Sequence, residues 1–294
     1  MLQILRKISF LIPLLLLSAN LSFAQSVLEN ENYFSPKNRL DFGNALFAEG
    51  DYLRASEEFA AYLNFCPNDT VLFKIGFANL RVGNYFKAAN VFKTLSEKSN
   101  LSLQAKLMFV KTKFISGDKR FVAGNGYASL NIPAPELNEV EKLKALTLLT
   151  EEKATPDSAI FFKPFQSQVY QDVSKFYLRK KNMKEKSPIT AAALSAVIPG
   201  AGKIYAENYG DGITAFLVTG LLAFIAYDNF QAGHDGRAWI FTGLAAFFYA
   251  GNVYGSYLSA KTFNFEMRLN FENDVKFFIK QNDYFIPEPD FLKR

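Results

Sequence analysis

Apolar side chains recur at helical spacing over most of this chain, and turn-forming residues interrupt the pattern at regular intervals. Glycine followed by Asp or Asn, at Gly50-Asp51 and Gly83-Asn84, predicts a tight turn between two helices of a pair. The helices predicted on either side of these turns are residues 38–49 and 52–64, and then 70–82 and 85–98. Because strand-type alternation is not needed to explain any of these segments, the pattern predicts an all-α fold.

The two predicted helix pairs share residue types in one register, 33 positions apart. The residues of the first pair are Gly43, Gly50, Tyr52, Ala55 and Phe59, and those matching them in the second are Gly76, Gly83, Tyr85, Ala88 and Phe92. We expect the first glycine and the alanine of each set to lie where the two helices approach most closely. The second glycine ends a helix, and the aromatic residues fill the space between helices. Matched positions at a fixed period predict a structural repeat.

This pattern resembles the tetratricopeptide repeat, whose consensus has Gly, then Gly-x-Tyr seven residues later, then Ala, Phe and a closing Pro. Pro67 takes the closing position in the first unit, whereas Asn100 stands there in the second. The resemblance implies a helical solenoid that holds an extended peptide or a partner helix in a concave groove and has no chemistry of its own. The alternative for its exposed polar side chains is an ordinary solvated surface.

A solenoid generally needs three or more units, so later helices are expected to complete this one. A weaker third unit is predicted around Gly117-Asp118, with helices at 103–116 and 119–130. Further helices are predicted at 136–153 and 157–181, and the repeat domain as a whole is assigned to residues 25–186.

The first 24 residues look like an export signal. Arg6 and Lys7 precede a short apolar run, and Ser22-Phe23-Ala24 supplies the small residues that a signal peptidase selects. The segment therefore predicts a cleaved signal peptide and a cell envelope of the Gram-negative type. An uncleaved N-terminal anchor is the alternative.

The composition changes at Ser187, where three uncharged segments begin, at 187–202, 212–227 and 238–260. The third is long enough to span a bilayer, and the second spans with help from flanking aromatic residues. The loop between them is short, so residues 187–264 are predicted to form a transmembrane helical hairpin, with a buried hairpin of a soluble domain as the alternative. Gly251, Gly255 and Ser259 give small residues every four positions, which lets helices approach closely and also allows a homo-oligomer.

The start of this region resembles small bacterial membrane modules of the TM2-like type, which carry a Pro-Gly-x-Gly signature before two hydrophobic helices. The matching residues are Leu194, Ser195, Pro199, Gly200, Gly202, Ile204, Tyr205 and Gly212, with Lys203 where Gln is often seen. The resemblance implies that Pro199 to Gly202 form a sharp turn into the hairpin, and it implies no activity. A phosphate-binding loop is excluded because Val197 and Ile204 stand where Gly and Ser or Thr are required.

Residues 265–294 are predicted to be an amphipathic tail that packs back on the repeats or lies on the membrane surface. The basic stretch 177–186 runs against the positive-inside tendency if the repeats are periplasmic. Either this stretch binds anionic headgroups from outside, or the membrane topology differs from the one assumed here.

The net charge and the counts of cysteine and histidine limit the classes of function that the sequence predicts. The net charge of +5 is mild and does not call for nucleic acid, and the single Cys66 and single His234 make a disulfide or a zinc site improbable. The sequence carries no constellation that predicts catalysis, a cofactor or a metal. We therefore expect a scaffold in the inner membrane, with periplasmic repeats that bind a protein or peptide. The alternative, motivated by Asn252 and the Pro-Gly-Ala-Gly turn, is an accessory subunit for transport or membrane-protein insertion.

Overall fold

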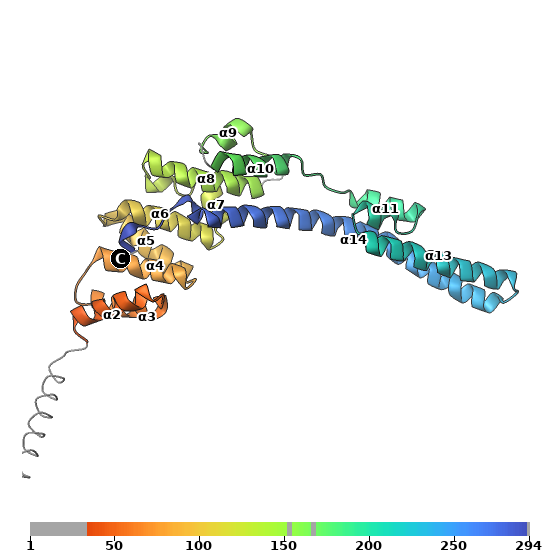
Figure 1. Cartoon of the computed structure of the whole chain (residues 1–294), viewed down its shortest axis with the longest axis horizontal. Coiled ribbons are helices and arrows are strands. Elements are labelled where there is room, and N and C mark those ends of the chain that lie inside the picture. The colour runs from red at the N-terminus through yellow and green to blue at the C-terminus, as the bar shows by residue number, and fades with distance from the viewer. Residues whose placement is uncertain (1–33, 152–154, 166–168, 293–294) are drawn as a thin grey trace, which may run out of the picture. The chain divides into compact units, whose positions relative to one another are not determined.

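The computed structural model describes residues 34–151, 155–165 and 169–292, and every regular element within these ranges is a helix (Figure 1). The all-α prediction is therefore confirmed for this part of the chain. The predicted signal segment, residues 1–24, lies outside the described residues. The chain divides into two compact units, residues 1–140 with 286–294, and residues 141–285.

The first unit consists of consecutive helices. They are α2 (Pro36–Ala48), α3 (Tyr52–Leu63), α4 (Asp69–Arg81), α5 (Tyr85–Lys98), α6 (Ser102–Ile115), α7 (Lys119–Ala123), η1 (Ala128–Leu130), the start of α8 (Ala134–Glu151), and η4 (Asp290–Leu292). From α2 to α7, each helix packs on the next along the chain. The first four agree with the predicted helices to within two residues at each end.

The turn inside each helix pair has one geometry. Gly50, Gly83 and Gly117 adopt φ of 83°, 81° and 87°, a region that residues with a Cβ rarely enter. The side chains that follow cap the next helix by accepting a backbone N–H three residues on; they are Asp51, Asn84 and Asp118. The weaker third turn predicted at Gly117 is thus the same turn as the other two.

The third pair departs from prediction after this turn. A helix was expected over 119–130, but α7 ends at Ala123, and Asn125 has a positive φ of 59°. A Cβ added at Gly126 would lie 2.5 Å from the ring of Phe121, so the chain can fold back tightly there. The run Gly124-Asn125-Gly126 therefore ends the helix early.

The second unit contains the rest of α8, then α9 (Ser158–Phe162), α10 (Tyr170–Lys181), α11 (Pro188–Val197), α12 (Ala201–Tyr205), α13 (Tyr209–Gln231), α14 (Asp235–Gln281) and η3 (Asp283–Phe285). A single helix was expected over 157–181, and this is wrong, because α9 and α10 are separate. Pro164 falls between them, and proline removes a helical hydrogen bond.

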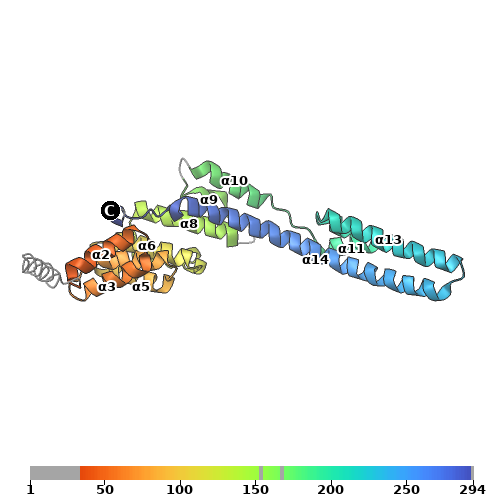
Figure 2. The same cartoon turned by 60° about the horizontal axis from the view of Figure 1, so that its bottom comes forward.

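Helices α13 and α14 run antiparallel beside each other, as Figures 1 and 2 both show. Helix α14 continues without interruption through the boundary predicted at 264/265, so residues 265–281 are not a separate tail. The reason is that Phe271, Val275 and Ile279 recur at helical spacing and are buried. The ring of Phe176 from α10 packs against Phe271 and Phe278.

Helix α13 is the one helix among the described residues that is long and apolar enough to cross a membrane. The second predicted span, residues 238–260, forms part of α14 and does not meet the same measure of length and apolar character. Large apolar side chains point outward on both helices; examples are Leu217, Leu221, Phe224, Trp239, Ile240 and Phe247.

Candidate functional site

The repeat residues predicted from the sequence lie in the core of the first unit. Ala55, Phe59, Ala88 and Phe92 are fully buried. A Cβ added at Gly43 would lie 2.8 Å from the ring of Phe59, and the equivalent distance from Gly76 to Phe92 is 2.9 Å. Each glycine thus makes room for the aromatic ring sixteen residues later.

The tyrosines and the proline take more peripheral positions. Tyr52 is partly buried and its ring lies nearly perpendicular to that of Phe47, with the ring centroids 5.3 Å apart. Tyr85 is likewise partly buried against the same core. Pro67 is exposed in the connection between α3, which ends at Leu63, and α4.

The C-terminal segment Ile286–Leu292 packs into this same unit. Phe291 meets Phe73 of α4 edge to face, with ring centroids 5.1 Å apart, and Leu292 is buried in the apolar core. The segment 286–289 has no regular structure, as its two prolines favour. These last residues therefore pack on α4 and α6 of the first unit.

Two basic side chains hold the segment through polar groups. Lys111 of α6 donates from Nζ to the backbone carbonyl of Ile286 at 2.9 Å, although the lysine is only 3% exposed. Arg81 of α4 forms an ion pair with Glu288, and its guanidinium also lies 4.8 Å from the ring centroid of Phe77. The contacts combine a backbone carbonyl, a carboxylate and an aromatic ring, which are features of an extended peptide.

Sequence patterns carry little signal for these contact residues. Lys111 stands inside the apolar run of α6, between Val110 and the buried Thr112, and a lysine at such a position needs a polar partner. That signal points to a buried contact without saying what makes it. Arg81 and Phe73 carry no signal beyond helical spacing.

Lys74, next to this surface, links α4 to α2. Its Nζ donates to Oδ1 of Asn44 at 2.7 Å and lies within 6 Å of the ring centroids of Phe47 and Phe59. Burial lowers the pKa of Lys74 below its ordinary value.

In the second unit, the predicted hairpin motif forms a tight turn between α11 and α12. Gly200 has φ of 86°, and an added Cβ would lie 2.0 Å from the carbonyl oxygen of Gly212. An added Cβ at Gly202 would lie 1.8 Å from the carbonyl oxygen of Ala191. These backbones touch, so the signature glycines are required by close approach, and the sharp turn expected after Pro199 is present.

Two serines fix this turn to α14. The backbone N–H of Gly202 donates to Oγ of Ser195 at 2.8 Å, and that oxygen is 2.6 Å from Oγ of Ser256. Both hydroxyls are fully buried. The hydroxyl of Tyr205 accepts from the backbone N–H of Ser187 at 3.1 Å, whereas Leu194 remains 38% exposed.

The small residues of α14 differ in what lies beside them within this chain. A Cβ added at Gly255 would lie 3.3 Å from Cε and 3.6 Å from Nζ of Lys203, whereas one at Gly251 would meet nothing within 4 Å. Within this chain, Gly255 gives room to the Lys203 side chain rather than to the backbone of another helix.

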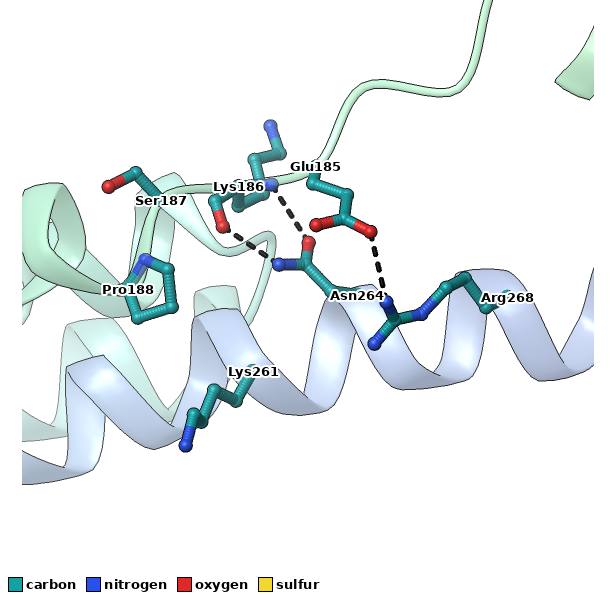
Figure 3. A pocket seen from close by; sticks show the side chains of 7 residues that line it. All are labelled: Glu185, Lys186, Ser187, Pro188, Lys261, Asn264 and Arg268. Carbon is teal, nitrogen blue, oxygen red and sulfur yellow. Dashed lines mark hydrogen bonds and ion pairs between the residues drawn. The ribbon is translucent and has the colours of Figure 1, made fainter. Parts of the chain in front are cut away.

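Above the hairpin, the linker before α11 is tied to α14 (Figure 3). Asn264 accepts from the backbone N–H of Lys186 at Oδ1 and donates from Nδ2 to the carbonyl of the same residue, both at 2.8 Å. Arg268 pairs with Glu185 at 3.1 Å. A cavity of about 380 Å³ lies here, and Lys261 also lines it. The surroundings are basic on balance, as expected from the stretch 177–186.

The described residues contain no candidate metal site. Within residues 34–151, 155–165 and 169–292, no group of three or more His, Cys, Asp or Glu side chains is close enough to hold an ion. Cys66 is a half-buried thiol in the connection before α4, and His234 lies in the connection between α13 and α14. Comparison with known protein families, with characterised proteins and with solved structures found no match for this chain.

Proposed function

We propose that this protein is a membrane-anchored scaffold of the cell envelope whose helical repeat unit binds an extended peptide of a partner protein. The proposal rests on one observation: the C-terminal segment 286–292 packs on helices α4 and α6. These are the first helices of the second and third helix pairs. In a tetratricopeptide solenoid, which this unit resembles, the first helices of the pairs line the concave groove.

The chemistry of this seat suits a peptide with a particular character. Lys111 offers a buried donor to a backbone carbonyl, which any peptide presents, and Arg81 offers an ion pair to an acidic side chain. Phe73 offers an aromatic face to a large apolar side chain. We infer that the partner segment is extended, proline-containing and acidic, with an aromatic or leucine residue three or four positions after the acid.

The anchoring part of the proposal is supported by α13 and by the apolar exposure of the hairpin. A helix of 23 residues is about 35 Å long, which is sufficient to cross the hydrocarbon core of a bilayer. Phe224 and Trp239 are 64% and 66% exposed in the isolated chain, and further large apolar side chains of the same two helices are exposed. Exposed large apolar side chains in such number are costly in water and favourable in lipid. The inner membrane with periplasmic repeats is the location that we propose.

The test of peptide binding uses the full-length protein in detergent and a fluorescent peptide with the sequence of residues 284–294. Phe291→Ala in the protein is expected to loosen its own segment and to increase binding of the labelled peptide relative to wild type. Adding Arg81→Ala is expected to reverse that gain, since it removes the ion pair. Lys98→Ala, a basic residue at the end of α5, serves as the matched control.

Peptide binding that is unaffected by Arg81→Ala would contradict the proposed seat. For the membrane part, alkaline carbonate extraction of cell membranes provides the check. Recovery of the protein in the soluble fraction, without detergent, would contradict anchoring.

An accessory role in transport or membrane-protein insertion is the second candidate. The observation that favours it is the cluster of polar side chains between α13 and α14, including Lys203 and Asn252. A deletion strain with unchanged substrate flux and unchanged insertion of membrane proteins would count against it.

A further inference from the structure

A cavity of about 430 Å³ lies between α13 and α14, and its lining mixes polar and apolar groups. Lys203 from α12 and Asp211 from α13 supply the charged groups, and Thr219 and Asn252 supply further polar groups. Phe247 is among the apolar residues that line it. Cavities of this size are typical of small-molecule sites.

Asn252 is the feature that distinguishes this cavity from a packing defect. The residue is 4% exposed, and neither Oδ1 nor Nδ2 has a hydrogen-bond partner in the part of the chain that the structure describes. Other asparagines of the second unit are paired: Asn229 donates to the carbonyl of Ile225, and Asn264 bonds both ways with Lys186. The residue lines the cavity although its two amide atoms have almost no accessible surface, so a bound group would pair with them once the side chain turns toward it.

The charged groups add a second constraint. Among the described residues, no carboxylate lies within 4.0 Å of the Lys203 ammonium, which is accommodated beside Gly255. Asp211 lies in the first turn of α13, where Asn208 donates to it at 3.0 Å. Thr219 is eight residues further along α13, and this places the two about 12 Å apart along the helix axis.

The ligand must therefore present an anion, a cation and a deeper polar group, with an apolar part beside Phe247 and Phe248. A free phosphate supplies only the anion. A zwitterionic phospholipid supplies all of them: its phosphate suits Lys203, its ammonium suits Asp211, and an ester carbonyl suits the Nδ2 donor of Asn252.

We propose that the cavity between α13 and α14 binds one zwitterionic aminophospholipid, held through Lys203, Asp211 and Asn252. The inference rests on the proposed membrane hairpin, because a phospholipid reaches this cavity from the bilayer. In this proposal Lys203 binds the lipid phosphate, and the adjacent Gly255 leaves room for the Lys203 side chain. Helix packing alone does not explain either residue.

The experiment is thermal unfolding of the full-length protein in detergent, titrated with phosphatidylethanolamine, phosphatidylglycerol or inorganic phosphate. Phosphatidylethanolamine is expected to raise the midpoint temperature of the wild type, with a weaker effect of phosphatidylglycerol and none of phosphate. Lys203→Gln and Asn252→Leu are each expected to lower the apparent lipid affinity about tenfold, as the loss of one hydrogen bond to a charged or buried group implies.

Two control variants separate this site from general lipid solvation. Lys261→Gln removes a lysine whose ammonium lies over the ring of Tyr257, outside this cavity, and Asn229→Leu removes a paired amide of α13. Both are expected to keep the wild-type response to phosphatidylethanolamine. Without added lipid, Asn252→Leu is expected to unfold at or above the wild-type temperature, because it removes an unpaired amide.

A wild-type response to phosphatidylethanolamine in Asn252→Leu would overturn the proposal, and so would equal responses to both lipids or a response to phosphate alone. The first of these results would show that the lipid does not pair with the amide. A protein that stays in solution without detergent would instead remove the membrane hairpin itself. Membrane insertion without any lipid-specific response would leave the scaffold proposal intact and refute this inference alone.

Discussion

The turn at Gly202 makes the sharpest stability prediction, because one methyl group must disturb three buried groups at once. In the Gly202→Ala variant, the new Cβ would lie 1.8 Å from the carbonyl oxygen of Ala191 and 2.8 Å from Oγ of Ser195. The carbonyl belongs to the backbone of α11 and cannot rotate away as a side chain can. We therefore expect α11 and α12 to separate, which breaks the bond between the Gly202 N–H and Ser195 and loosens that between Ser195 and Ser256.

The magnitude follows from these contacts. Overpacking a well-packed site costs about 1–3 kcal/mol, and two weakened hydrogen bonds add about 1 kcal/mol each. The expected loss of stability is thus about 3–5 kcal/mol. For a unit of this size, roughly 2–4 °C per kcal/mol gives a fall in midpoint temperature of about 6–20 °C. Gly251→Ala is the matched control, since its Cβ would meet nothing within 4 Å. It is expected to be neutral or slightly stabilising.

Trp239 is the chain's single tryptophan and lies in the hairpin, so its fluorescence follows unfolding of the second unit. Thermal unfolding of the full-length protein and both variants in one detergent, read by this fluorescence, provides the assay. If Gly202→Ala unfolds within about 1 kcal/mol of Gly251→Ala, the close approach of α11 and α12 is refuted.

Three further outcomes are expected. Gly76→Ala places a Cβ 2.9 Å from the ring of Phe92 and is expected to destabilise the first unit by about 1–3 kcal/mol, measured by denaturant unfolding. Hydrogen bonding from Arg54 lowers the pKa of Asp51 below its ordinary value of 3.8. The ionised Asp51 cap therefore stabilises the fold at pH values above 3.8, and this stabilisation is lost as the pH falls through the lower pKa of the folded state. Asp51→Asn should therefore flatten the acid limb of a pH–stability curve, and an unchanged limb would contradict the role of this carboxylate. Asn264→Leu removes two hydrogen bonds to the linker backbone and is expected to speed limited proteolysis within 182–187, with no such change for Asn229→Leu.

Much of the first unit could be predicted from local signals. Glycine in a left-handed conformation followed by a capping Asp or Asn marks the turn, and both determinants lie within two residues of each other. A left-handed residue recurs at Glu207 and at Gly233 in the second unit, with φ of 64° and 71°. Asn208 then caps α13 as in the first unit, whereas His234 makes no side-chain cap at the start of α14. The turn at Glu207 was not predicted, because glutamate rarely adopts a positive φ.

The positions of the binding groups could not be predicted in this way. Arg81 and Glu288 are 207 residues apart in sequence, and Lys111 and Ile286 are 175 apart. Helical periodicity states which face of a helix is buried, and it does not state which distant segment covers that face. Lys111 in its apolar run was the only visible hint, and it identifies the need for a partner rather than the partner.

For the protein as a whole, the sequence by itself determined the helical class, the first four helices with their turns, the glycines that the cores require and the apolar character of α13. These features follow from interactions among residues that are close in the chain, and the spacing of such residues can be read directly from the sequence. The tertiary structure alone decided that α14 is one helix of 47 residues and that the C-terminal segment packs on α4 and α6. It also decided that Asn252 is buried beside a cavity, with no side-chain hydrogen-bond partner among the described residues. Each of these depends on contacts between segments far apart in the chain, and a single sequence carries no record of such contacts.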